Sequence, residues 1–275
     1  MISNSKAVGD SVKKGILLCY NVIIPALFPF LVLTLLISKS GILLALPFPE
    51  KSKYFLKYLG IFILSLIGGY PIGAKLISEA CDNNLIGKRD ARLLLYSSVN
   101  SGPAFTVLAV GGGILGSTKQ GWLLYLAQAT SSMIIFLIIF PILSKKYIPY
   151  EKKISLSDSF VLAVSDASVS MLSMSGFIII CSVMIEILEK TALPALIKRV
   201  LFLTVEISNA ILETKNIYLL CFILSFGSLS IIFQVLFISK SFKPNIIKIL
   251  ISRILNGILS TTILFIICKK HVYKC

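Results

Sequence analysis

Long apolar runs separated by short polar connections are the main pattern along this chain. They cover residues 15–38, 59–77, 104–115, 121–143, 160–188, 200–212, 217–238 and 246–268. Several of them reach the roughly 20 residues that a helix needs to cross a bilayer. Hydrophobic residues make up 56% of the chain, whereas soluble domains are roughly 45–50% apolar. The pattern predicts an all-α fold, a polytopic transmembrane helical bundle in the cell membrane.

Glycine, proline and polar residues interrupt several of these runs. The stretch Gly68–Lys75 (Gly-Gly-Tyr-Pro-Ile-Gly-Ala-Lys) places glycines, a proline and a lysine inside one apolar run. Proline removes a backbone donor, and in lipid the freed backbone groups must find partners in protein or along a water-filled cavity. Broken helices of this kind are typical of transporter substrate sites. We expect broken or re-entrant helices, with breaks at 25–30, 68–75, 100–103, 173–177, 206–210 and 225–230.

The breaks follow one another in the same order in the two halves of the chain, which predicts two structural repeats. The first repeat covers 1–145 and the second 156–270, with a basic connecting loop at 146–155. An odd number of crossings in each half would make the repeats inverted. The least basic turns contain Lys119 and Lys215. Placing both turns outside the cell would instead make the repeats parallel, and the sequence leaves both arrangements open.

The net charge of +15 comes mostly from lysine and arginine in the short connections. Basic short loops are the positive-inside signal of membrane proteins, so we expect the lipid bilayer as a partner and no nucleic acid. Six scattered cysteines and a single histidine provide no set of zinc ligands. No GxSxG or HExxH motif occurs, so we expect no enzyme and no cofactor. We interpret the polar segment 1–12 as retained, because no small-residue cleavage site follows it.

Two charged residues inside apolar runs are the strongest candidates for a site. Glu206 lies in the middle of 200–212, where a carboxylate could hold a sodium ion, share a coupling proton or bind ligand hydroxyls. The alternative is a structural partner for Lys75 or Arg253. Lys75 follows the Gly73 break, where a new helix end would add positive charge. Its alternatives are snorkelling to the interface and pairing with Glu79 one turn later.

Polar residues at the other breaks complete the candidate site. Inward-pointing helix ends expose donors and acceptors for a polar ligand. For the amides of Gln128 and Gln234, interhelical bonding is an equal alternative. Asp166 lies in a serine-rich stripe that is a candidate cavity wall, and Glu186 is expected to be solvated. The candidate substrate-binding residues are Gly69, Tyr70, Lys75, Asn100, Ser101, Glu206, Ser208, Asn209, Ser225, Ser228 and Gln234.

Several motifs together resemble membrane proteins with the nucleoside-recognition, or Gate, domain, and the sporulation integral membrane protein branch most of all. The matching stretches are Pro25–Phe30, Gly68–Lys75, Asn100–Phe105, Val110-Gly111, Gly176-Phe177, Glu206–Ser208 and Ser225–Ser230 with Gln234. The resemblance implies a membrane protein of an endospore-forming bacterium. It also implies a distant relation to nucleoside transporters, in which the Gate region is a broken-helix substrate and ion site.

These observations predict a permease-like protein that binds or moves a small polar solute, such as a nucleoside, at a site near the bilayer midplane. The alternative is a non-transporting component of spore envelope assembly that acts through other sporulation membrane proteins. If the first interpretation holds, Lys75, Asn100, Glu206 and Ser228 should converge on one internal cavity.

Overall fold

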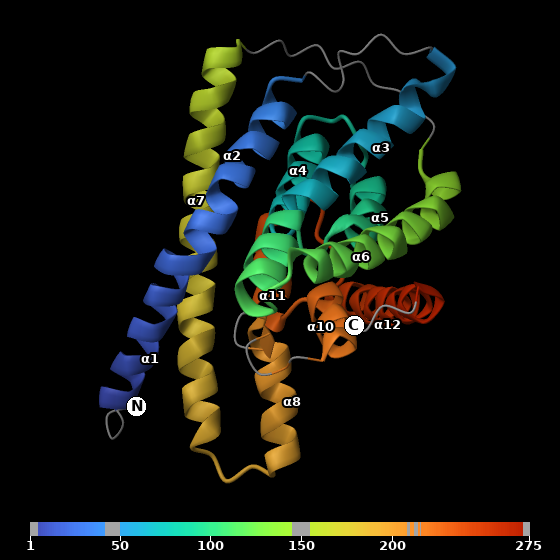
Figure 1. Ribbon diagram of the computed structural model, residues 1–275. Helices are drawn as coiled ribbons and strands as arrows, with labels where there is room; N and C mark the ends of the chain where they lie inside the picture. The colour runs from blue at the N-terminus through green and yellow to red at the C-terminus, as the bar shows by residue number, and fades with distance from the viewer. Residues whose placement is uncertain are drawn as a thin grey trace.

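The computed structural model describes residues 5–41, 50–144, 155–207, 210–211, 214 and 216–271. Most of these residues are helical and none of them is in a strand, which confirms the all-α prediction. The elements are α1 (Ser5–Leu18), the π-helical turn η2 (Cys19–Ile23), α2 (Ile24–Lys39), α3 (Glu50–Gly68), α4 (Ile72–Asp82), α5 (Lys88–Ser98), the π-helical η3 (Ala104–Ile114), α6 (Thr118–Ile139), the 3-10 turn η4 (Phe140–Ile142), α7 (Leu156–Glu189), α8 (Ala195–Val205), α10 (Ile217–Phe226), α11 (Leu229–Ile238) and α12 (Ile246–His271) (Figure 1).

Within the described ranges, five segments are long and apolar enough to cross a membrane. They are Lys6–Lys39, Thr118–Ile142, Leu156–Glu189, Ile217–Ile238 and Ile246–Lys269. Many large apolar side chains on these segments are exposed, such as Leu172 on α7 and Leu255 on α12. In a bilayer such side chains contact lipid, so they avoid the unfavourable exposure of apolar surface to water. The protein is therefore a multi-pass membrane protein.

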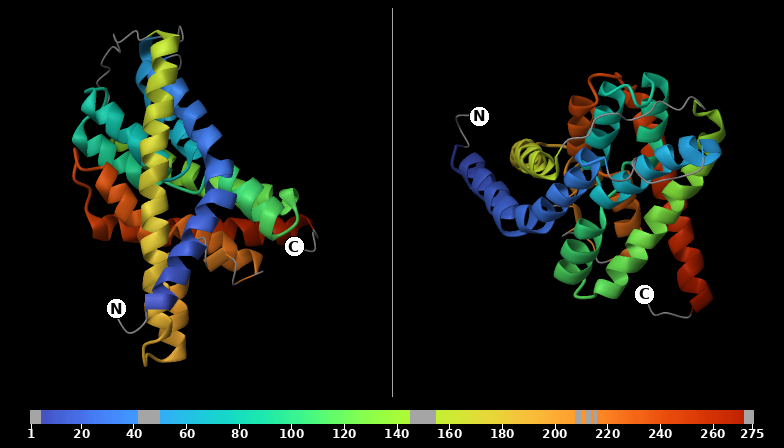
Figure 2. Two further views of the ribbon diagram at one scale, coloured as in Figure 1. Left: turned by 90° about the vertical axis from the view of Figure 1, so that its left-hand side faces the viewer. Right: turned by 90° about the horizontal axis from the view of Figure 1, so that it is seen from above.

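The long helix α7 packs along α1 and α2, and together they form one side of the molecule. Figure 2 shows these three helices on one side in the view from above, with the remaining helices gathered beside them. On that other side, α6 and α12 run at a large angle to the direction of α7 (Figure 1). Helix α12 packs against both α10 and α6. The main cluster of buried apolar side chains is shared by both sides.

Four of the predicted breaks coincide with helix ends. Helix α3 ends at Gly68 and α4 begins at Ile72, with a cis Tyr70–Pro71 bond between them. Helix α5 ends at Ser98 and η3 begins at Ala104, so residues 99–103 separate them. The backbone of Glu206 is extended directly after α8. Helices α10 and α11 are separated at 227–228, where Gly227 has a φ of 80°.

The predicted break at 173–177 is wrong, because α7 is continuous from Leu156 to Glu189. One of the two serines in this stretch bonds within the helix: the hydroxyl of Ser175 donates to the carbonyl of Met171 at 3.0 Å. Such bonds to the preceding turn keep the hydroxyl satisfied without opening the backbone. Gly176 alone lowers helix stability by only about 1 kcal/mol, which tertiary packing overcomes.

The predicted break at 25–30 is also wrong, because α2 runs through both prolines of this stretch. Pro25 lies in the first turn of the helix, where a missing donor costs little. Pro29 lies inside the helix. The irregular backbone lies one turn earlier, in the π-helical residues of η2. These two stretches are the first predicted break of each half, so they correspond to each other in the predicted repeats. The two repeats stay a prediction, and most of the connecting loop 146–155 lies outside the described residues.

Candidate functional site

An inner cavity lies where segments from several helix breaks meet. Gly68, Tyr70 and Pro71 line it from the first break, Gly102 from the second, and Glu206 from the third. Gln234 on α11 lines it as well, and apolar side chains of η2, α2 and α7 complete the wall. The volume is about 40 Å³, which is enough for water or a small ion.

The first two breaks are in direct backbone contact. The backbone N–H of Tyr70 donates to the carbonyl of Asn100 at 2.8 Å. Gly69 has a φ of +69°, and a Cβ at this position would lie 2.3 Å from the backbone nitrogen of Gly102. Only glycine fits both the left-handed backbone and this approach. Gly69 is therefore a packing position between the first two breaks.

The side chain of Tyr70 connects the first break to the last one. It lies in the buried interior, and its hydroxyl donates to the carbonyl of Leu224 at 2.7 Å. Leu224 precedes the end of α10, and the ring of Tyr70 lies beside Gly227. A single side chain therefore fixes the spacing between segments from the two halves of the chain.

A buried hydrogen-bond network surrounds Asn100. Its Oδ1 accepts from Arg253 Nη1 at 3.1 Å and from Asn256 Nδ2 at 3.3 Å, and its own amide group donates to the hydroxyl of Ser132. Arg253 Nη2 also donates to the carbonyl of Tyr96 at 2.9 Å. This network joins the second break to α5, α6 and α12. Asn100 is thus a structural centre and is not among the residues that line the inner cavity.

The remaining hydroxyl groups of the predicted site also bond to neighbouring helices. Ser101 Oγ donates to Gln128 Oε1 at 2.6 Å, which gives this glutamine the interhelical role that was one of its alternatives. Ser225 Oγ lies 2.7 Å from Ser260 Oγ on α12. Ser228 Oγ accepts from the N–H of Ile231 at 3.3 Å and caps α11.

An outer cavity of about 240 Å³ adjoins the inner one. Pro71, Met174 and Gln234 line both cavities. The outer wall also carries Lys75 and Glu79 from α4, whereas the wall of the inner cavity has Glu206 as its charged side chain among the described residues. Gln234 Nε2 donates to Ser230 Oγ at 3.3 Å. In the described part of the chain its Oε1 has no hydrogen-bond partner, so it is available as an acceptor between the cavities.

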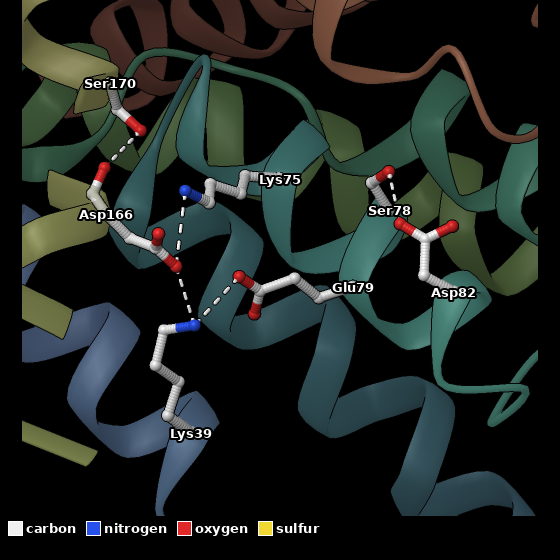
Figure 3. A network of polar contacts seen from close by, with 7 residues as sticks. All are labelled: Lys39, Lys75, Ser78, Glu79, Asp82, Asp166 and Ser170. Carbon is white, nitrogen blue, oxygen red and sulfur yellow. Dashed lines mark hydrogen bonds and ion pairs between the residues drawn. The ribbon is translucent and has the colours of Figure 1, made fainter. Parts of the chain in front are cut away.

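Four charged side chains form a cluster of ion pairs between α2, α4 and α7, and two of them, Lys75 and Glu79, line the outer cavity. Lys39 Nζ lies 2.7 Å from Asp166 Oδ2 and 3.2 Å from Glu79 Oε1, and Lys75 Nζ lies 3.4 Å from Asp166 Oδ2. Figure 3 shows Lys39 between the two carboxylates. Glu79 therefore pairs with Lys39 and not with Lys75. We call Lys39, Lys75, Glu79 and Asp166 the charged cluster.

The expectation that four polar residues converge on one cavity is wrong. Glu206 lines the inner cavity and Lys75 the outer one, whereas Asn100 and Ser228 bond within the helix framework. Ser208 and Asn209 lie outside the described residues. Within the described ranges, no group of three histidine, cysteine, aspartate or glutamate residues is arranged to hold a metal ion.

The sequence does not predict Lys39 as a site residue, nor Ser132, Asn256 and Ser260 as the partners of the break residues. The sequence does contain a feature that could identify Ser132, Asn256 and Ser260 as interhelical contacts. Each is a small polar residue inside an apolar run that the sequence predicts to span the membrane. Such residues face other helices because lipid offers no hydrogen bonds. Their specific partners could not be inferred from spacing.

Part of the chain is similar to a known bacterial membrane protein. Over 142 residues it is 28% identical to the sporulation integral membrane protein YlbJ of Bacillus subtilis (strain 168). The match covers 49% of this chain and 35% of that protein, so it spans about a third of the relative's length. No family model and no solved structure matches the chain. With its five apolar segments, the chain is an integral membrane protein that has a sporulation-related homologue.

Proposed function

We propose that this protein is a permease-like membrane protein, and not an enzyme, that binds and moves a small polar solute through the two adjoining cavities. The observation that carries the proposal is the inner cavity itself, which is lined by three helix breaks and a buried glutamate. Ionisable groups inside membrane segments are expensive and mark substrate or ion pathways. Discontinuous helices that meet at one cavity are the usual construction of such pathways.

The two cavities suit two stages of solute binding. The outer cavity is lined by positively and negatively charged side chains and by hydroxyl groups. Its volume of about 240 Å³ admits a small solute. The inner cavity of about 40 Å³ is too narrow for one. A solute that reaches Glu206 therefore requires the helices around Gln234 and Pro71 to separate. This is the alternating access expected of transporters with broken helices.

The resemblance to Gate-domain proteins supports a nucleoside as the solute. Nucleosides carry hydroxyl and amide donors, which the carboxylate of Glu206 and the Oε1 of Gln234 can accept. Both side chains line the inner cavity. A proton or a sodium ion at Glu206 is the coupling ion in this proposal.

Uptake by purified protein in liposomes tests the proposal. The solutes are labelled uridine, adenosine and a panel of amino acids, with sodium or pH gradients in either direction. We expect Glu206→Gln to lower the initial uptake rate at least tenfold, since the cavity loses its charge while its shape is kept. The matched control is Glu189→Gln, an exposed carboxylate at the end of α7, which should leave uptake unchanged. Equal loss in both variants, or no uptake of any solute by the wild-type protein, contradicts the proposal.

A second candidate is a non-transporting role in spore formation, through contacts with other membrane proteins. The name of the similar Bacillus protein favours it, since that name describes a sporulation integral membrane protein. The test is restoration of spore formation in a host that lacks its own copy. Full restoration by both Glu206→Gln and Lys75→Ala, together with no solute uptake, supports this candidate and rules out the permease proposal.

A further inference from the structure

A third cavity, separate from the other two, is formed by two basic segments that are far apart in the sequence. Arg89 and Arg92 line it from the first turns of α5, Lys243 from the connection between α11 and α12, and Lys248 from the first turn of α12. Its volume is about 350 Å³. The sequence shows only that both segments are basic, whereas the structure brings them around one hollow. We call it the basic cavity.

Among the described residues, no ion pair neutralises the charges around the basic cavity. Among the residues described as lining it none is acidic, and within the described part of the chain none of its four cations has a carboxylate partner. Asp90 is adjacent to Arg89 in sequence, but it faces α3 and accepts from the hydroxyl of Tyr58 at 2.6 Å. Cations held around one hollow repel each other, so an anion that enters it is attracted by all four.

Hydrogen bonds also fix one of these cations and the start of α12. Arg92 Nη1 donates to the carbonyl of Phe242 at 3.3 Å, which ties α5 to the segment that carries Lys243. Asn245 Oδ1 accepts from the N–H groups of Ile247 and Lys248, which caps α12 and leaves its amide NH2 group to donate to a ligand. The cavity is thus a built site with donors from two elements.

We propose that the basic cavity binds a phosphate group, carried either by the headgroup of an anionic phospholipid or by a soluble phosphate compound. Arginine binds phosphate oxygens through two parallel hydrogen bonds, and lysine adds charge without a fixed geometry. The cavity lies at the first turn of α12, where the membrane-spanning segment Ile246–Lys269 begins. Basic pockets at the ends of membrane helices are where anionic headgroups bind. The site shares no lining residue with the two solute cavities.

The test uses the purified full-length protein in detergent and two kinds of probe. Native mass spectrometry measures retention of phosphatidylglycerol against phosphatidylcholine, and isothermal titration measures binding of inorganic phosphate and pyrophosphate. The variant is Arg89→Gln with Lys248→Gln, both exposed positions. The matched control is Lys13→Gln with Lys14→Gln, which removes the same charge from exposed positions on α1. Circular dichroism and size-exclusion chromatography report the fold of each variant.

We expect the cavity variant to weaken binding of one probe at least tenfold, and the control variant to leave it within about twofold, since each basic residue near an anionic surface contributes about 1 kcal/mol. Loss confined to phosphatidylglycerol identifies a lipid headgroup as the source of the phosphate. Loss confined to phosphate or pyrophosphate identifies a soluble compound. Equal weakening by both variants, or binding of neither probe by the wild-type protein, overturns the proposal. If the double variant is unfolded, Lys243→Gln is tested in its place, and the same binding measurements decide the proposal.

Discussion

The network around Asn100 and the charged cluster at the outer cavity both join distant helices, but they differ in access to solvent. Asn100 is 1% exposed and Arg253 3% exposed. In the charged cluster the exposed fraction of the side chains ranges from 15% for Lys39 to 33% for Asp166. Solvent does not reach the first network, so water cannot replace a lost hydrogen-bond partner there. Solvent reaches the side chains of the second, so water can hydrate them when an ion pair separates. The comparison indicates that the first network fixes the fold, whereas breaking the ion pairs of the second costs less free energy.

This difference follows from the cost of leaving a polar group without a partner. A buried group that loses its hydrogen bond keeps the full desolvation penalty, and the penalty is larger for a charge. Partly exposed ion pairs contribute little to stability because water and salt compete for both partners. The charged cluster connects α7 with α2 and α4, and two of its members line the outer cavity, so in the permease that we propose it would be a contact that separates.

The largest effect is expected from Asn100→Leu. The substitution removes the acceptor of Arg253 and Asn256, so it leaves a buried cation with one remaining carbonyl partner, that of Tyr96. We expect a loss of about 3 kcal/mol in the free energy of unfolding. Reversible unfolding in mild detergent, followed by circular dichroism, measures it.

Two further variants decide whether the stranded charge is the cause. Asn100→Leu with Arg253→Met removes both partners, and it should recover most of the lost stability because apolar replacement of a buried polar pair is close to neutral. Asn83→Ala, at an exposed position after α4, should change stability by less than about 0.5 kcal/mol. If the double variant is less stable than Asn100→Leu alone, the network is not organised around the arginine.

A pair of glycine substitutions compares a true break with a failed one. Gly69→Ala places a methyl group 2.3 Å from the nitrogen of Gly102 at a φ of +69°, so we expect a loss of about 2–3 kcal/mol. Gly176→Ala meets nothing within 4 Å on the continuous helix α7, so it should stabilise the protein by up to about 1 kcal/mol. Thermal unfolding in the same detergent checks both. A destabilising Gly176→Ala would mean that α7 is broken at 173–177 after all.

Two of the breaks that the sequence predicted correctly carry a residue whose backbone cannot be helical. Gly69 and Gly227 have positive φ, whereas Pro29 shows that a proline alone can be accepted inside a helix. The failed break at 173–177 rests only on serine and glycine. Serine can bond back to its own helix there. Local chemistry therefore predicts a break where a residue must take positive φ, and does not where serine, glycine or a proline only weakens the helix.

The partners across the fold could not be predicted, because they depend on packing between distant elements. Asn100 and Arg253 are 153 positions apart. Lys39 looked like the polar end of an apolar run, and its two carboxylate partners lie on α4 and α7. Glu206 and Gln234 were singled out from their apolar surroundings, and the structure places both at the inner cavity. Spacing identified unusual side chains, but tertiary structure alone decides what they face.

The smallest effect on stability is expected from the charged cluster, and this is where the comparison is sharpest. Asp166→Asn removes the carboxylate that pairs with Lys39 and Lys75. Because both ends reach solvent, we expect a loss below about 1 kcal/mol, and a coupling energy to Lys39→Gln of about 0.2–1 kcal/mol in a double-mutant cycle. Unfolding at low and high salt measures both quantities, and the coupling should fall as salt rises. A coupling energy above about 3 kcal/mol that salt does not change would show that the charged cluster stabilises the fold as the Asn100 network does. The cluster would then not separate to admit a solute.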